Sequence, residues 1–597
     1  MGSAGRSFLA LRAPLYLLCV LLASCGGGGG SGAGSSNTPT STQSTPVSKT
    51  DAYRFLNQST FGATEAEATR LIALGDSSTA YSRWIDAQIA RDPSLLLPAV
   101  ESAFPDPIPQ NFVVGSLNAV RLEQWFANAL RGDDQLRQRV AFALSEIFVV
   151  SQVGALLNLP NATASFHDML ARNAFGNYRT LLEEVTLHPA MGVYLSMLGN
   201  QRAVSGTNLR PDENYAREMM QLFSIGLVQL NLDGSVRTDA AGQPIPTYNQ
   251  DVIEGFARVF TGWKWDCPST APNCTFTTTR PQLAPVIAYN QIKPMRLYPE
   301  QHESGAKRVL DYSGVALPNA TIPAGQTGSQ DLKDALDNVF NHPNVGPFIA
   351  KQLIQKLVTS NPSPAYVQRV AERFNNDGNG RRGNLEAVIR AILLDTEARA
   401  VPSGSATMTA GKLKEPLMRL TQLWRAYEAT SRSGKLGVAG NFTGGVGAVF
   451  GQAQGSAPSV FNFFSPFYAP PGEIADSGRV APEMQLATEY TNTQIANFFW
   501  VQALARTHVS TTLGADIMFI NTTEELALAN DSEALINRVA ERLLGGSSQM
   551  SAALKAQAKA QIERTTIPTT NPGTALATRV ADAIFFVVTS PEYTLQR

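Results

Sequence analysis

The chain has 597 residues and a formal net charge of −1, and 16% of its residues are charged, whereas an average soluble protein has about 25%. A hydrophobic share of 44% is ample for a large core. The near-neutral balance, without any basic run, gives no reason to expect a nucleic-acid partner. Length alone would suggest several domains, but only the N-terminal region contains a low-complexity linker.

The first 25 residues have the features of a bacterial lipoprotein signal peptide. Arg6 and Arg12 precede an apolar run, residues 13–25, that is too short to span a membrane. The run ends in Leu-Ala-Ser-Cys, which resembles a lipobox, so Cys25 is the expected lipidation site. The residue after Cys25 is not aspartate, which favours the outer membrane. We expect a lipid-anchored outer-membrane protein that faces the periplasm or the cell surface; a plain cleaved signal peptide is the alternative.

A flexible tether is predicted after the signal. Residues 26–50 are rich in glycine, serine, threonine and proline, a composition typical of linkers without a packed core. No sequence repeat of fixed period follows, so a solenoid is not expected. We predict a single large domain over residues 51–597.

From residue 51 onward most apolar residues recur with helical spacing. Thr64 and Glu67 form a capping box before a helix that is expected to end at Gly75. The following ranges also have helical periodicity: 78–90, 118–131, 134–151, 165–175, 178–188, 210–226, 249–263, 347–359, 364–374, 384–400 and 412–430. The sequence therefore predicts a mainly α fold, a large multi-helix globular domain.

A short β and loop excursion is predicted between Thr261 and Pro299. It contains Cys267 and Cys274, the two cysteines that remain outside the signal peptide. Two cysteines close together on a proline-containing loop in an oxidising compartment favour a local disulfide. Two free thiols are the alternative.

One predicted helix, residues 210–226, points a carboxylate into its own apolar face. At about 100° per residue, Glu218 projects between Tyr215 and Leu222. Glu213 and Arg217 lie one turn apart on the opposite side, where an exposed ion pair is easily accommodated. An unpaired buried carboxylate is costly, so Glu218 is expected to be paired, protonated or turned toward a cavity. A structural ion pair and a functional pocket carboxylate are the two interpretations.

Two other helices supply candidate partners. Glu184 and His188 are four residues apart and can touch; they could ligate a metal or act as an acid–base pair, or His188 is a hydrogen-bonded core histidine. Arg137 lies beside apolar positions near the start of its helix, where it can reach solvent or pair with Glu218. Glu254 and Arg258 are expected to form an ordinary surface ion pair.

Residues 302–308, "HESGAKR", place a histidine, an acid and two bases around a glycine. Such a turn, with His302 and Lys307, suits an anion or a polyhydroxy ligand. An exposed polar turn is the simpler interpretation.

Residues 375–386, "NNDGNGRRGNLE", fit the spacing of an EF-hand loop. The residues at ligand positions are Asn375, Asp377, Asn379 and Glu386. Asparagine at the first position and Arg382 at the usual apolar position would make calcium affinity poor. A glycine-rich turn between helices is the preferred interpretation, with Ca²⁺ as the weaker one.

Several motifs occur together in a characteristic order. They are RFLNQSTFGAT, LHPAMGVYL, ENYAREMMQLFSIGL, DVIEGFARVFTGW, HESGAK, HPNVGPFIAKQLIQKLV, GRRGNLEAVIRAILLD and KLKEPLMRL. The chain resembles the bacterial family called domain of unknown function 1800 from Ala52 to the C-terminus. The resemblance implies an exported, mostly helical protein, and a companion from a secreted family similar to sulfatases and alkaline phosphatases. The motif positions that match include Glu213, Asn214, Arg217, Glu218, His302 and Lys307.

Two hypotheses about function remain open. The first is an envelope enzyme or ligand-binding protein with a polar pocket between helices, acting on an exported polymer, glycan or ester. Glu218 would be its central carboxylate, and Glu184, His188, His302 and Arg137 or Arg217 would surround it. The second is a noncatalytic lipoprotein that scaffolds a secreted partner, its motifs being buried ion pairs. The cofactor and the reaction are not indicated.

Overall fold

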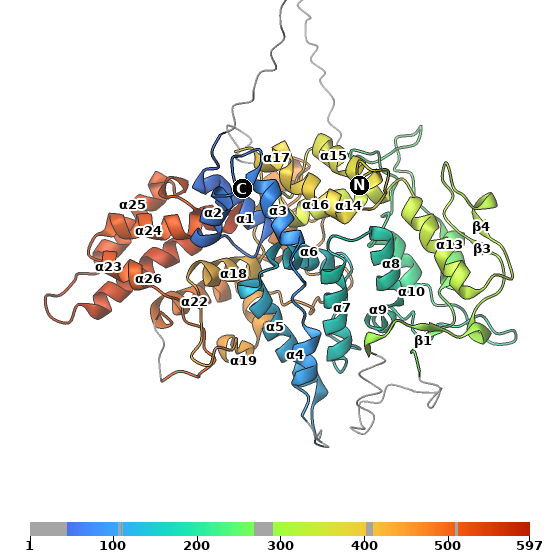
Figure 1. The fold of residues 1–597 in the computed structure, drawn as a ribbon, viewed down its shortest axis with the longest axis horizontal. Helices are drawn as coiled ribbons and strands as arrows, with labels where there is room; N and C mark the ends of the chain where they lie inside the picture. Colours follow the sequence, from blue (N-terminus) through green and yellow to red (C-terminus); the bar gives the residue numbers. More distant parts are fainter. Residues whose placement is uncertain (1–44, 106–108, 110, 268–290, 402–409, 508–511) are drawn as a thin grey trace, which may run out of the picture. The chain divides into compact units, whose positions relative to one another are not determined.

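The computed structural model describes residues 45–105, 109, 111–267, 291–401, 410–507 and 512–597. These residues form a mainly helical fold with few, short strands, as the periodicity predicts (Figure 1). Residues 45–597 belong to one compact unit. Cys25 and most of the predicted tether lie outside the described residues, and so does Cys274.

The helices of the first half begin before the predicted domain boundary. They are α1 (Lys49–Ser59), α2 (Glu65–Ile72), α3 (Ala80–Ile89), α4 (Leu97–Ser102), α5 (Leu117–Arg131), α6 (Gln135–Ser145), α7 (Pro160–Arg172), α8 (Tyr178–Leu187), α9 (Pro189–Tyr194), α10 (Asn214–Gln221) and α11 (Gln250–Val259). Thr64 caps α2, because its Oγ1 accepts a hydrogen bond from the Glu67 amide. Val47, inside the predicted tether, is buried, so the packed domain includes the last residues of that segment.

The helices of the second half include one, α13, that the periodicity did not single out. They are α13 (Gly328–Asn341), α14 (Val345–Leu357), α15 (Pro364–Asn375), α16 (Leu385–Leu394), α17 (Thr396–Arg399), α18 (Pro416–Ala426), α19 (Val438–Asn441), α20 (Val446–Phe450), α21 (Glu473–Asp476), α22 (Glu489–Ala505), α23 (Thr523–Leu528), α24 (Ser532–Leu544), α25 (Ala552–Arg564), α26 (Gly573–Val588) and α27 (Pro591–Thr594). Short 3-10 turns include η6 (Pro482–Leu486).

The strands form three antiparallel pairs. β1 (Trp263–Lys264) pairs with β2 (Arg296–Leu297), β3 (Lys307–Arg308) with β4 (Thr321–Ile322), and β5 (Lys412–Leu413) with β6 (Leu595–Gln596). The first pair confirms extended structure in the predicted excursion. The disulfide between Cys267 and Cys274 stays a prediction, because the second cysteine is not described.

Two hydrophobic cores meet at α6. The first is built mainly from α1–α3, α7–α11 and α13–α16, and the second from α4, α5, α18 and the helices that follow α18. Leu136, Val140 and Leu144 of α6 enter the first core, whereas Phe142 enters the second. In Figure 1, α6 accordingly lies between α8–α13 and the orange-to-red α22–α26. Side chains at this junction are buried, and they are divided between the two cores.

Candidate functional site

Glu218 on α10 is half-buried, as the helical phase predicts, but no ion pair satisfies it. Its Oε2 is buried without a hydrogen-bond partner among the described residues. Burial raises the pKa of the carboxyl, and the nearby Arg217 only partly opposes the shift. Arg217 instead pairs with Glu213 at 2.6 Å, which confirms the predicted i, i+4 ion pair. Asn214, the first residue of α10, is exposed.

Arg137 is not the partner of Glu218. Its guanidinium donates to the backbone oxygens of Ala171, Ile89 and Arg91 at 3.0–3.2 Å and lies over the Phe175 ring. The predicted alternative pairing is therefore wrong, because local carbonyl groups already occupy the guanidinium. Glu254 and Arg258 do form their surface pair, at 3.8 Å.

Glu184 and His188 make separate interactions. His188 ends α8 and caps α9, and its Nδ1 accepts a hydrogen bond from the Ala190 amide at 3.1 Å. Its Nε2 lies 3.2 Å from Ser165 Oγ. Glu184 accepts from Asn173 at 2.7 Å. Burial lowers the pKa of His188 to about 3, so the imidazole is neutral and serves as a hydrogen-bonded capping group.

The "HESGAKR" turn holds an anion that comes from the protein itself. His302 Nε2 lies 2.9 Å, and Lys307 Nζ 2.6 Å, from Asp331 Oδ2 on α13. All three side chains are buried, so the exposed-turn interpretation is wrong for His302 and Lys307, whereas Ser304 and Ala306 of the same turn are exposed. Burial opposes ionisation of Asp331, but the hydrogen bonds from His302 and Lys307 prevail and keep its pKa below the ordinary value.

In the EF-hand-like loop, protein donors occupy side-chain oxygens that a calcium ion would need. Asp377 accepts from the Asn379 and Arg381 amides and from the Asn384 side chain. Two of the other oxygen-bearing positions are also paired, Asn375 with Arg382 and Glu386 with Arg390. The loop between α15 and α16 is thus built as a turn that binds its own polar groups. Among the described residues no three histidine, cysteine, aspartate or glutamate side chains are arranged to hold a metal ion.

Replacing Glu218 with glutamine is expected to leave the melting temperature unchanged or raise it. Folding raises the pKa of this carboxyl, so the folded protein loses stability as the pH rises above the ordinary pKa of 4.5. The neutral amide removes that cost. Thermal unfolding of Glu218→Gln and of the matched Glu213→Gln variant at pH 5 and pH 7.5 measures this. If the melting temperature of Glu218→Gln at pH 7.5 falls by many degrees, the carboxylate of Glu218 stabilises the fold and has a structural role.

A buried charge cluster lies where the two cores meet. We call it the Glu146 cluster; its members are Arg139, Glu146, Lys356, Lys412, Glu415 and Glu483. Lys412 Nζ lies 2.8 Å from Glu483 and 3.7 Å from Glu415, and Lys356 Nζ lies 3.4 Å from Glu146. The cluster thus contains three acids and three bases, whose charges partly compensate one another.

Within this cluster Glu146 is the group that holds a proton near neutral pH. Burial and the neighbouring Glu415 carboxylate raise its pKa to about 7, against the opposing charges of Lys356 and Lys412. The pKa of Glu415 is lowered, because burial is outweighed by the charges of Lys412 and Arg139. When two adjacent carboxyls share one proton, the pKa of one is raised and that of the other is lowered in this way. The interaction with Glu415 therefore favours the protonated form of Glu146.

Glu146 also lines a cavity of about 490 Å³, the Glu146 cavity. Its polar end is formed by Glu146, Lys356 and Gln352, whose Nε2 is buried without a partner in the described structure. The rest of the wall is mainly apolar, with Gln221, Lys351, Gln355, Asn462 and Ser465 interspersed. Four of its large apolar side chains are also exposed to solvent: Leu227, Val236, Phe461 and Phe467. Such a mouth admits an apolar group and brings it toward the buried carboxyl.

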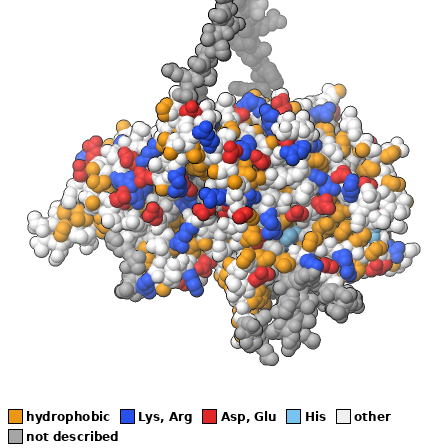
Figure 2. Space-filling view, viewed as in Figure 1, with side chains coloured by type: hydrophobic (Ala, Val, Ile, Leu, Met, Phe, Trp, Pro, Cys, Tyr) orange, Lys and Arg blue, Asp and Glu red, His pale blue; other side chains and the backbone are white. Residues whose placement is uncertain are grey.

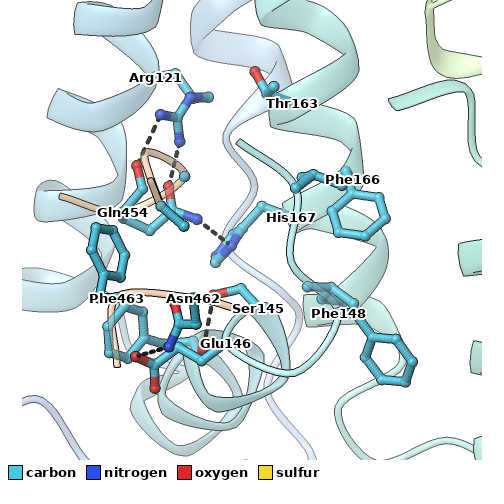
Figure 3. A pocket seen from close by; sticks show the side chains of 15 residues that line it. Arg121, Ser145, Glu146, Phe148, Thr163, Phe166, His167, Gln454, Asn462 and Phe463 are labelled. Carbon is cyan, nitrogen blue, oxygen red and sulfur yellow. Dashed lines mark hydrogen bonds between the residues drawn. The ribbon is translucent and has the colours of Figure 1, made fainter. Parts of the chain in front are cut away.

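A second, inner cavity of about 20 Å³ is also lined by Glu146 and Asn462 (Figure 3). That volume is sufficient for one water molecule. Gln454 Oε1 accepts from the buried Arg121 and its Nε2 donates to His167 Nδ1 at 2.9 Å. The opposite ring nitrogen, His167 Nε2, consequently carries the hydrogen and has no hydrogen-bond partner among the residues that the structure describes. Burial lowers the pKa of His167 to about 3, so the inner cavity presents a neutral imidazole N–H.

The structure thus separates the predicted site residues and brings others together. Glu218, His188 and His302 line neither the Glu146 cavity nor the inner cavity, and no hydrogen bond or ion pair joins them in the described part of the chain. The sequence contained one signal for the missed group. Glu146 interrupts the apolar segment "FALSEIFVV", in which a charge without a nearby partner in sequence indicates a buried carboxylate.

Acidic and basic side chains are interspersed on the face shown in Figure 2, without a large area of one sign. Within the described ranges no helix combines the length and the apolar character needed to cross a membrane. The fold and the site define a large helical protein with a buried carboxyl at a cavity beside the first core. Its residues 54–595 match the family described as Protein of unknown function (DUF1800), and the chain belongs to that family. Neither the curated proteins nor the solved structures contain a match.

Proposed function

We propose that this protein is an envelope ligand-binding protein or enzyme whose site is the Glu146 cavity. The observation that carries the proposal is a carboxyl with a pKa near 7 at the closed end of a large, apolar-mouthed cavity. Cavities of several hundred Å³ with apolar walls and few polar groups are typical ligand sites. A pKa near the ambient pH suits a group that gives and takes protons.

The residues of the cavity wall favour one of the three proposed substrate classes, which are a polymer, a glycan and an ester. Leu227, Phe461 and Phe467 offer large apolar surfaces at the mouth, whereas a glycan would require polar partners along the wall. Lys356 and Gln352 supply the polar contacts at the inner end. An ester with an apolar part fits this arrangement better than a polymer of sugars. Its polar group would lie at Glu146, which acts as the general acid or base of hydrolysis or group transfer.

The N-terminal features support an envelope location for this activity. Lipidation at Cys25 and a disulfide between Cys267 and Cys274 both belong to an exported protein. Within this proposal the protein is anchored in the outer membrane, and its cavity receives material in the envelope. These elements depend on the sequence, since Cys25 and Cys274 lie outside the described residues.

A noncatalytic scaffold is the second candidate, and one observation favours it. The family-motif residues His302 and Lys307 are sealed around Asp331, and His188 is a buried cap. Side chains that are buried and paired in this way hold helices and turns together and are not available to a substrate. A scaffold would present a surface to the sulfatase- or phosphatase-like companion that the family resemblance implies, and it would need no occupied cavity.

Binding of the uncharged fluorescent probe N-phenyl-1-naphthylamine tests the proposal. Wild-type protein is expected to bind the probe with saturation. The Val236→Trp variant should bind about tenfold more weakly, because the indole occupies the mouth that the probe must enter. Val204→Trp is the matched control, since Val204 is 44% exposed, Val236 is 46% exposed and only Val236 lines the cavity. Equal affinity of both variants, or no binding by the wild type, would favour the scaffold.

A further inference from the structure

A third cavity, of about 660 Å³, contains a buried cation that the Glu146 cluster does not use. Arg419 on α18 lines it and is 7% exposed. Its Nε donates to the Lys414 carbonyl oxygen at 3.0 Å. Neither Nη group donates a hydrogen bond, and no carboxylate of the described residues pairs with the guanidinium. We call this the Arg419 cavity.

An unpaired buried guanidinium is costly unless a ligand or solvent in the cavity meets it. Lys412 also lines the cavity, but its ammonium is held by Glu483 and by the Lys356 carbonyl oxygen. Arg479 lines the rim, is exposed, and likewise forms no side-chain hydrogen bond or ion pair within the described structure. Arg597 lines the cavity as well, so Arg419 and Arg479 are two of three guanidinium groups that can act on the same ligand.

The remaining lining indicates what else the ligand carries. Glu473 is the one acidic side chain among the lining residues, and it is exposed. Ile495 and Phe499 of α22 supply a buried apolar wall. The planar guanidinium fork matches the paired oxygens of phosphate, sulfate or carboxylate groups. The chemistry of the lining is thus cationic at one side and apolar at the other.

We propose that the Arg419 cavity is a second ligand site, which binds an oxyanion group attached to an apolar body. Arg419 holds the oxyanion from the cavity wall and Arg479 holds it from the rim, while Ile495 and Phe499 contact the apolar body. The site is distinct from the Glu146 cavity, because the two cavities share no lining residue. It goes beyond the proposed function, which needs no anion.

Calorimetric titration of the purified protein with phenyl phosphate, inorganic phosphate and phenol tests this site. Phenyl phosphate should bind at least about tenfold more tightly than either of the others, since it alone engages both parts of the cavity. Arg479→Gln, at an exposed position, should weaken phenyl phosphate about tenfold. Arg419→Lys should do the same, because an ammonium lacks the fork.

One control makes the result specific. Arg202→Gln removes an exposed arginine that lines none of the three cavities and should leave the affinity for phenyl phosphate unchanged. Unchanged affinity in Arg479→Gln would overturn the proposal, as would an equal loss in Arg202→Gln. If phenol binds as tightly as phenyl phosphate, the cavity does not recognise an oxyanion, and that part of the proposal is wrong. If Arg419→Lys does not fold, the Arg479→Gln result alone decides.

Discussion

Asp331→Asn should destabilise the protein by about 3–5 kcal/mol, the cost of breaking a buried ion pair by removing one partner. Lys307 would be left as a buried cation whose side chain is 1% exposed, and His302 would face a neutral amide instead of a carboxylate. Denaturant unfolding measures the loss. The double variant Asp331→Asn/Lys307→Met should recover part of it, because the uncompensated charge is gone.

Asp311→Asn is the matched control. Asp311 pairs with Arg308 in the same region, but its side chain is 64% exposed, so its loss should cost no more than about 1 kcal/mol. The pKa of Asp331 is lowered by folding, so its stabilisation should fade in the wild type as the pH falls below the ordinary value of 3.8. Equal stability of Asp331→Asn and Asp311→Asn would contradict this account of the turn.

The affinity of the Glu146 cavity for N-phenyl-1-naphthylamine should fall about tenfold between pH 6 and pH 8, a change equivalent to roughly 1.4 kcal/mol. Glu146 is protonated below its raised pKa of about 7 and ionised above it. An ionised carboxylate resists being covered by an apolar ligand. Fluorescence titration at several pH values measures the change. In Glu146→Gln the affinity should be the same at pH 6 and pH 8.

Other charged groups face the same cavity, and the design separates them from Glu146. Lys356 and Lys351 line it, and burial lowers the pKa of Lys351; both remain in the Glu146→Gln variant. Glu533→Gln is a matched control at an exposed position and should retain the wild-type pH dependence. If Glu146→Gln retains it as well, the titrating group is not Glu146.

Local interactions were the predictable part of the structure. The Glu213–Arg217 and Glu254–Arg258 pairs are separated by one helical turn, so spacing alone places them together. The burial of Tyr215 and the half-burial of Glu218 likewise follow from helical phase. Each of these inferences concerns one helix and does not depend on which elements are neighbours.

The candidate site was not predictable in the same way, because its residues come from distant segments. Glu146, Lys356 and Glu415 are brought together by the packing of α6 against α14 and by the start of α18. The anion held by the "HESGAKR" turn comes from α13, a helix that was not singled out. Thr327 caps it, and Leu332, Ala335, Leu336 and Val339 form its buried face. That pattern would have placed Asp331 on the buried side, but not its partners.

Two predicted contacts failed for a local physical reason. His188 is followed by Pro189, which ends α8, so the i, i+4 geometry with Glu184 is lost at the last residue. Arg137 was considered as a partner for a distant carboxylate. Three backbone carbonyl oxygens within reach satisfy it instead.

The central claim is that Glu146 carries an exchangeable proton at the closed end of a ligand cavity. Infrared difference spectroscopy of the purified protein, recorded as a pH titration, measures that proton directly through the C=O band of the protonated carboxyl. The account predicts a band with a midpoint near pH 7 that is absent in Glu146→Gln and is perturbed when N-phenyl-1-naphthylamine is added. A wild-type titration without such a band, or one that Glu146→Gln retains, would contradict it.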